Sequence, residues 1–241
     1  HMTSPIQYSF ERYEKKYWLS PVQEEFLRER LKTYMKEDAY GQYTIGNLYY
    51  DTDDWRLVRA SVERPVYKEK LRVRSYGAGT ADSPVFAELK KKCSGIVYKR
   101  RIRLDPETAG RFLAGELPGA AWGQIGRELE WFQHIYHAGP KVYIGYDRTA
   151  LSGLQDPELR ITFDHNIRWR MTELDLRCGD AGEPVIPIRQ GLMEIKVPGV
   201  YPLWLSHLLA EAGAYPVSFS KYGACYERHI MKEIRLNGLT A

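Results

Sequence analysis

Charged residues alternate with apolar ones along several stretches of this sequence, and most charges on the polar side are positive. From 68 to 74 every second residue is basic, and Leu71 and Val73 are the apolar residues between them. A period of two is typical of a β-strand, whose successive side chains point to opposite faces. The same alternation recurs at 12–17, 85–92, 96–103, 141–148, 158–165 and 192–197. These segments predict a chain built mainly of strands.

The polar faces of these predicted strands are lopsided in charge, with fourteen bases and five acids. The bases are Arg12, Lys16, Lys68, Lys70, Arg72, Arg74, Lys90, Lys92, Lys99, Arg101, Arg103, Arg148, Arg160 and Lys196, and the acids are Glu14, Glu88, Glu158, Asp164 and Glu194. A sheet with one face in water normally mixes the signs, because like charges across a strand pair repel. We therefore favour an α+β fold over a solvated sheet: an antiparallel β-barrel, or tunnel, with a basic interior and helices packed on the outside.

A basic interior implies its ligand, because crowded cations repel one another unless an anion lies among them. Between Arg64 and Arg103 there are twelve Lys or Arg and three acids, although the whole chain has 35 bases against 31 acids, a net charge of +4. Binding of duplex DNA usually needs a more basic surface overall, so we expect no nucleic-acid partner. A compact anion with many oxygens fits better, and phosphate chains are bound mainly by Arg and Lys.

The length of 241 residues suits one large domain or two small ones. No linker or internal repeat divides the chain, so we expect a single domain over 3–241, with His1 and Met2 as a cloning remnant. No apolar run approaches the ~20 residues of a membrane helix, and no signal-peptide pattern is present. A parent protein could still carry a membrane portion outside this sequence.

Several common kinds of site find no support in the sequence. Cys93, Cys178 and Cys225 are far apart and lack CxxC spacing, which favours neither disulfides nor zinc and indicates a cytoplasmic location, including the inner face of a membrane reached through partners. His134 and His137 resemble a metal pair, but we interpret them as residues of a helix surface. Walker A and GxGxxG loops are absent.

Five helices are predicted from capping signals and from apolar residues at helical spacing. Ser20 and Pro21 begin the first, as N-cap and first helical residue. The others are expected from 105 to 115, from 125 to 136, from 203 to 212 with Gly213 as C-cap, and from about 220 towards 230.

Nine short motifs occur in an order that points to a known family. They are Arg12-Tyr-Glu-Lys-Lys-Tyr-Trp18, Tyr49-Tyr-Asp-Thr52, Lys70-Leu-Arg-Val-Arg74 before Tyr76-Gly77, Glu88-Leu-Lys90, Ser94-Gly95 before Lys99, Tyr146-Asp-Arg-Thr-Ala150, Arg160-Ile-Thr-Phe-Asp164, Glu194-Ile-Lys196 and Ser218-Phe-Ser-Lys-Tyr222. From Phe10 to about Glu227 the chain resembles the triphosphate tunnel metalloenzymes (the CYTH-like superfamily). It is most similar to the catalytic domain of the vacuolar transporter chaperone (VTC) polyphosphate polymerases.

The resemblance implies roles for particular residues. The catalytic set would be Lys16, Arg72, Arg74, Lys90, Arg148, Arg160 and Glu194, and the further phosphate contacts would be Lys70, Lys99, Lys196, Ser220 and Lys221. Glu194 would hold the divalent metal, Mn²⁺ or Mg²⁺, while Glu14 and Glu88 would help the metal or orient the lysines. Ser220 would contact phosphate near a helix N-terminus, where backbone N–H groups favour anions.

The sequence also departs from the family pattern at two positions. The wider superfamily opens with Glu-x-Glu-x-Lys, whereas this chain has Arg12-x-Glu14-x-Lys16. A base at the first position argues against the hydrolytic triphosphatases and fits the polymerases. Ser218 stands where the eukaryotic polymerases tend to have Lys, which removes one expected phosphate contact.

The implied activity is transfer of the γ-phosphoryl of ATP to a growing chain of inorganic polyphosphate, or to pyrophosphate. Such a transfer needs positioning and charge neutralisation more than covalent help from the protein. Three alternatives stay open: a hydrolase of tripolyphosphate or nucleoside triphosphates, a non-catalytic binder of polyphosphate or inositol phosphates, and, less favoured, a single-stranded RNA binder. Lys90, Arg148, Arg160 and Glu194 could also be plain surface charges or salt-bridge partners. Primer requirement, chain length, preferred metal and oligomeric state cannot be read from the sequence.

Overall fold

The computed structural model describes residues 12–238 apart from 64, 78, 95 and 188. Its strands are β1 (Arg12–Leu19), β2 (Met35–Asp51), β3 (Tyr67–Tyr76), β4 (Val85–Cys93), β5 (Ile96–Leu104), β6 (Gly139–Gly153), β7 (Arg160–Arg170), β8 (Glu183–Pro184), β9 (Gly191–Pro198) and β10 (Pro216–Val217). Its helical segments are α1 (Pro21–Leu31), α2 (Arg56–Val62), α3 (Pro106–Leu113), η1 (Gly119–Trp122), α4 (Gly123–Tyr136), α5 (Leu203–Ala212), α6 (Lys221–Cys225), η2 (Tyr226–Ile230) and α7 (Met231–Leu236).

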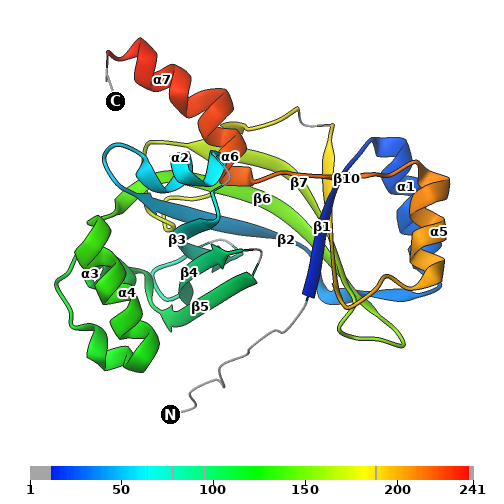
Figure 1. The fold of residues 1–241 in the computed structure, drawn as a ribbon, viewed down its shortest axis with the longest axis horizontal. Helices are drawn as coiled ribbons and strands as arrows, with labels where there is room; N and C mark the ends of the chain where they lie inside the picture. The colour runs from blue at the N-terminus through cyan, green and yellow to red at the C-terminus, as the bar shows by residue number, and fades with distance from the viewer. Residues whose placement is uncertain (1–11, 64, 78, 95, 188, 239–241) are drawn as a thin grey trace. The chain divides into compact units, whose positions relative to one another are not determined.

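Hydrogen bonds order the described strands as β10-β1-β9-β7-β6-β2-β3-β4-β5, with β8 paired to β7. Every pair whose register is described is antiparallel. The α+β class and the large antiparallel sheet predicted from the sequence are thus confirmed (Figure 1). The strand order is a path with β10 and β5 at its ends, so closure into a barrel stays a prediction.

The chain divides into two compact units, each assembled from three separate segments. Unit 1 takes His1–Gln42, Arg148–His165 and Ile188–Ser218, and unit 2 takes Tyr43–Asp147, Asn166–Pro187 and Phe219–Ala241. Because β2, β6 and β7 contribute residues to both units, neither unit is a continuous piece of chain. The single domain over 3–241 remains a prediction.

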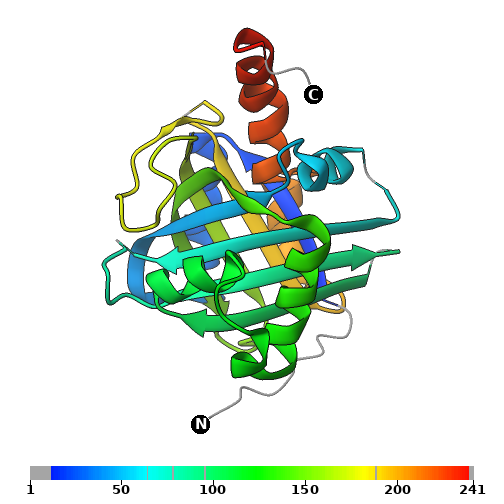
Figure 2. The same cartoon turned by 90° about the vertical axis from the view of Figure 1, so that its left-hand side faces the viewer.

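Unit 2 buries the apolar face of β3, β4 and β5 under helices α3 and α4 (Figure 2). The strands contribute Leu71, Val73, Val85, Ala87, Leu89, Ile102 and Leu104, and the helices contribute Ala109, Phe112, Leu113, Leu129 and Phe132. Three charged residues of these strands also lie on the helix side: Lys91, whose Nζ is 3.7 Å from Glu69 Oε1, Glu69 itself, and Arg100. The other charged side chains of these strands lie on the face that the helices leave open.

Unit 1 repeats this arrangement with other elements. The buried side chains of β1, β7 and β9, such as Tyr17, Ile161 and Ile195, pack against Leu27 of α1 and Leu205 of α5. In both units the sequence alternation places the apolar residues under helices and leaves most of the charged residues on the opposite face. The prediction that helices pack on the apolar faces of the strands is confirmed within each unit.

The predicted capping signals describe most helix ends correctly. Ser20 forms a full capping box with Gln23 at the start of α1, Asp105 caps α3, and Gly213 ends α5 with a left-handed φ of 64°. The last helix was predicted to run from about 220 towards Ile230, but the helical stretch continues through the π-helix η2 into α7. None of the helices among the described residues is long and apolar enough to cross a membrane.

Helix α2 was not predicted, because its own N-cap residue gives no sequence signal. That residue is Trp55, in the left-handed conformation and without a side-chain capping bond. Asp51 takes over the capping from outside the helix, accepting hydrogen bonds from the backbone N–H of Leu57 (2.9 Å) and Val58 (3.1 Å). The first turn of α2 is thereby satisfied by a residue at the end of β2.

Substitutions on the two faces of β4 test this arrangement. Leu89→Ala should lower the free energy of unfolding by about 2–5 kcal/mol, because Leu89 is fully buried under the helices. Lys92→Ala, on the polar face of the same strand and exposed, should change it by less than about 0.5 kcal/mol. Urea denaturation measures both, and a small loss for Leu89→Ala would contradict the packing described here.

Candidate functional site

The predicted site residues divide between the polar faces of the two units. Unit 2 holds Lys70, Arg72, Arg74, Lys90, Lys99, Ser220 and Lys221, and unit 1 holds Lys16, Arg148, Arg160, Glu194 and Lys196. Gly95 of the Ser94-Gly95 motif and the side chain of Arg12 lie outside the described residues.

Strand register builds rows of positive charge across β3, β4 and β5. Lys70 lies opposite Lys90, which lies opposite Lys99. Directly across the strands, such neighbours have Cβ atoms ~5 Å apart, where like charges are destabilising. The next row contains the acid of this face, Glu88, between Arg72 and Arg101. The register therefore places more like charges opposite one another than is usual on a sheet face exposed to water.

Glu88 holds three of these cations together. Its side chain is 1% exposed, and its oxygens lie 2.9 Å from Lys99 Nζ, 3.5 Å from Arg72 NH2 and 3.5 Å from Arg74 Nε. Burial raises the pKa of Glu88, but the charges of the two arginines and the lysine outweigh it and hold that pKa at about 2. Glu88 is therefore a permanent anion at neutral pH, which supports a role in orienting the cations.

Uncharged groups of β2 and β6 orient the two arginines further. Arg74 Nε donates to Asn47 Oδ1 (2.8 Å), and its NH2 donates to the hydroxyl of Tyr146 (3.0 Å). Arg72 NH1 donates more weakly to the hydroxyl of Tyr49 (3.4 Å). Sequence reasoning missed Asn47 and Tyr49 as site residues. The signal that could have found them is their spacing of two, which places both on the β2 face that lies beside Arg74 and Arg72.

Ser220 and Lys221 join this face at the start of α6. Ser220 is the N-cap of that helix, and its Oγ accepts hydrogen bonds from Gly223 N (3.2 Å) and Lys70 Nζ (2.8 Å). Because the oxygen accepts from two donors, the hydroxyl proton is directed to neither of them and can be donated to another acceptor. Lys221 Nζ lies over the ring of Tyr146, 4.3 Å from its centroid. Lys221 thus shares Tyr146 with Arg74, and Ser220 contacts Lys70 of the same face.

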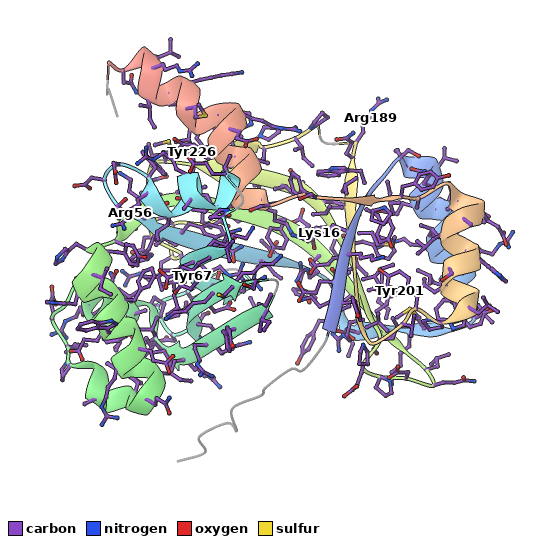
Figure 3. All side chains as sticks on the ribbon, viewed as in Figure 1. Lys16, Arg56, Tyr67, Arg189, Tyr201 and Tyr226 are labelled. Carbon is purple, nitrogen blue, oxygen red and sulfur yellow. The ribbon has the colours of Figure 1, made fainter. Side chains whose placement is uncertain are left out.

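The polar face of unit 1 mixes signs instead of concentrating cations. Lys16 and Thr162 flank Glu194 in register, and Glu14 and Arg160 flank Lys196. Lys196 Nζ lies 3.7 Å from Glu194 Oε1 and 3.8 Å from Glu14 Oε1. Figure 3 labels Lys16 on one side of β1 and Tyr201 on the other side, which α1 and α5 cover.

Two arginines of unit 1 are engaged in ion pairs. Arg148 makes a two-pronged pair with the fully buried Asp164, through Nε–Oδ1 (2.7 Å) and NH2–Oδ2 (2.8 Å). Arg160 NH2 lies 3.0 Å from Asp38 Oδ2, and its side chain is 42% exposed. Such a pairing fixes a guanidinium plane without using all five of its N–H groups. The pairs are therefore compatible with a structural role and with a phosphate contact.

The carboxylates of unit 1 are suitable partners for a hard divalent cation. Mg²⁺ and Mn²⁺ prefer oxygen ligands, and Mg²⁺ is commonly bound through one or two carboxylates together with substrate phosphates. Glu194 and Glu14 both reach Lys196, so their oxygens lie near one another. No group of three or more His, Cys, Asp or Glu that could hold a metal occurs among the described residues. The donor set fits a metal that takes most of its ligands from phosphate.

A cavity of about 570 Å³ in unit 1 contains none of the predicted site residues. Helix α1 and the strands beneath it line this cavity, and a hydrogen bond of 2.7 Å between His165 Nε2 and Glu24 Oε1 lies in its wall. A Cβ at Gly191 would lie 2.5 Å from Glu24 Oε1, so a larger residue there would displace the Glu24 side chain.

The charge of Glu88 should be visible in the stability of the protein. Because the folded-state pKa lies below the ordinary value of 4.5, its contribution is present above about pH 4.5 and is lost as the pH falls towards 2. Glu88→Gln should therefore cost about 3 kcal/mol at pH 7, and the difference from the wild type should shrink steadily below pH 4.5. Urea titrations across this pH range measure it. A difference independent of pH would show that Glu88 is not a low-pKa anion.

Comparison with known proteins gives a family for the chain. The VTC domain model matches residues 11–230, nearly the whole sequence. No curated protein matches. Among solved structures, the chain is similar to a candidate adenylate cyclase from Vibrio parahaemolyticus (10% identity, 87% of this chain and 94% of that one covered, TM-score 0.45). It is also similar to the PH1819 protein from Pyrococcus horikoshii OT3 (11% identity, 92% and 99% covered, TM-score 0.44). The family match confirms the resemblance drawn from the motifs: this chain belongs to the VTC domain family.

Proposed function

We propose that this protein is a polyphosphate polymerase that transfers the γ-phosphoryl of ATP to the end of an inorganic polyphosphate or pyrophosphate chain, in the cytoplasm and with Mn²⁺ or Mg²⁺. The observation that carries the proposal is the basic face of β3, β4 and β5. There a single buried carboxylate, Glu88, serves three cations, and Lys70 and Lys90 add charge in the next row. Such a face favours a polyanion over any neutral ligand.

The residues of unit 2 bind and orient the phosphates in this proposal. Arg72 and Arg74 present guanidinium groups whose planes are set by Tyr49, Asn47 and Tyr146, which suits two-pronged contact with phosphate oxygens. Lys70, Lys90, Lys99 and Lys221 add charge. Ser220 donates its hydroxyl proton to a phosphate oxygen, since its own oxygen already accepts two hydrogen bonds.

The residues of unit 1 have their own roles in this proposal. Lys16, Arg148, Arg160 and Lys196 bind phosphate oxygens, and Glu194 holds the divalent cation with Glu14 close by. When bound, that cation would neutralise phosphate charge and act as a Lewis acid at the phosphate oxygens. In the reaction, a terminal phosphate oxygen forms a bond to the γ-phosphorus while the bond to the β,γ-bridging oxygen breaks, and ADP leaves. The protein contributes alignment and charge neutralisation, which are the main requirements of phosphoryl transfer.

The activity is tested by following phosphate species directly. With ATP and Mn²⁺, a ³¹P NMR time course should show a growing mid-chain phosphate signal together with ADP, with pyrophosphate supplied as acceptor. Orthophosphate without chain growth would instead establish a hydrolase on the same fold. Line broadening of added polyphosphate without turnover would favour a binding module.

Removal of the proposed metal ligand should abolish turnover and leave the fold intact. Glu194→Ala is expected to lower the rate by at least about 100-fold, because phosphate charge is then no longer neutralised by a held cation. Glu158→Ala is the matched control, since Glu158 is an exposed glutamate of the same unit. Equal rates in the two variants would show that Glu194 does not hold the metal that turnover requires. Circular dichroism checks that both are folded.

Removal of a phosphate-binding guanidinium should weaken nucleotide binding. Arg72→Ala is expected to lower the affinity for ATP by about 10- to 100-fold, since a charge-assisted contact to phosphate is lost. Arg100→Ala is the control, because Arg100 lies on the helix side of β5 and pairs with Glu128 (3.1 Å). Calorimetric titration gives both affinities. Similar losses would mean that net charge, and not the polar face, determines binding.

A further inference from the structure

We propose that Asp51 and Tyr222 are positioning residues, which fix Ser220 and Lys221 for contact with phosphate. The inference rests on the proposed function of those two residues and deepens it. Asp51 is the third residue of the Tyr49-Tyr-Asp-Thr52 motif, and Tyr222 ends the Ser218-Phe-Ser-Lys-Tyr222 motif. The two residues are 171 positions apart in sequence. The structure brings the two motifs together within unit 2 through a hydrogen bond of 2.7 Å from the Tyr222 hydroxyl to Asp51 Oδ2.

Asp51 is a buried carboxylate whose hydrogen-bond donors are uncharged. It is 1% exposed and accepts hydrogen bonds from Thr52 N (2.8 Å), Leu57 N (2.9 Å), Val58 N (3.1 Å) and the Tyr222 hydroxyl. Three of these donors are backbone amides around the start of α2, which hold the carboxylate rigidly. Asp51 is therefore a fixed acceptor in the core of unit 2.

Tyr222 is held by its ring and by its hydroxyl. It is 2% exposed, and its ring stacks on Tyr49 with centroids 4.5 Å apart and planes 23° apart. Burial and the nearby Asp51 charge raise the pKa of Tyr222 well above its usual value, so the phenol keeps its proton and stays a donor. The Tyr222 backbone is thus held where the hydroxyl can reach Asp51.

Ser220 and Lys221 immediately precede this fixed residue. A change in the placement of Tyr222 would turn the first residues of α6 and move the Ser220 hydroxyl away from Lys70 and Lys221 away from Tyr146. The same face of β2 also supplies Asn47 and Tyr49, which precede Asp51 by four and two residues. One strand face thereby positions Arg74, Arg72 and the start of α6.

Binding of inorganic tripolyphosphate without divalent metal tests the inference by a double-mutant cycle. Tyr222→Phe keeps the ring stack and removes one hydroxyl, and should lower the affinity by about tenfold. In a Ser220→Ala, Lys221→Ala background it should cost less than about twofold, because the residues that it positions are already gone. An undiminished loss in that background would overturn the proposal.

Tyr17→Phe is the matched control for this cycle. Tyr17 is also 2% exposed, and its hydroxyl likewise makes one hydrogen bond, to Tyr201 (3.1 Å), on the helix side of unit 1. The affinity of Tyr17→Phe should equal that of the wild type. If Tyr17→Phe loses as much affinity as Tyr222→Phe, the loss of any buried tyrosine hydroxyl would explain the effect, and the proposal would fail. Asp51→Asn should lower the affinity as much as Tyr222→Phe does. If Asp51→Asn does not fold, the comparison of Tyr222→Phe with Tyr17→Phe still tests the proposal.

Hydrogen–deuterium exchange separates a failure of this inference from a failure of the proposed function. The amides of Gly223 and Ala224 bond to Ser220 Oγ (3.2 Å) and Ser220 O (2.8 Å). They should exchange faster in Tyr222→Phe and at the wild-type rate in Tyr17→Phe. If the wild type binds no tripolyphosphate, the proposed function fails and the exchange rates alone decide whether Tyr222 holds α6. Unchanged exchange in Tyr222→Phe would overturn the proposal.

Discussion

The crowding of positive charge on one face of β3, β4 and β5 is the constraint on which unit 2 depends. Lysines opposite one another in register repel, and Glu88 offsets this for three cations without neutralising the whole face. The free energy that holds these strands together must therefore come from their other face. There the apolar residues are buried under α3 and α4, where each fully buried aliphatic side chain contributes about 1.5–3 kcal/mol. The packing of the helices on the apolar face thus offsets the charge repulsion on the basic face of β3, β4 and β5.

The polar face of unit 1 differs in its balance of charge, and the difference suits a different task. Arg148 is matched by Asp164, Arg160 by Asp38, and Lys196 by two glutamates. A metal needs anionic oxygens that remain ionised, and such oxygens are retained more easily beside fixed cations than in an apolar pocket. A polyanion needs an excess of cations, which is the condition on unit 2. The same alternation along the sequence therefore gives two faces of distinct electrostatic character.

The sequence predicted what the backbone period determines and missed what register and distant contacts determine. Alternation placed Lys70 and Leu71 on opposite faces, because a strand allows no other arrangement. The ends of α1 and α5 followed from Ser20, Pro21 and Gly213, whose effects are local. The partnership of Asp51 with α2 and Tyr222 could not be predicted, since it joins segments far apart in the chain. The site residues named from the family motifs remain predictions, although each set lies on one polar face of its unit.

The choice of uncharged groups around the arginines has a physical reason. A carboxylate beside every guanidinium would fix it equally well but would cancel the positive charge that attracts a polyanion. Asn47, Tyr49 and Tyr146 orient Arg72 and Arg74 without removing that charge. Glu88 supplies one negative charge that lies within 3.5 Å of three of the cations. Uncharged groups thus orient the arginines while their positive charge is kept. In the proposed function, the anionic ligand neutralises most of that charge.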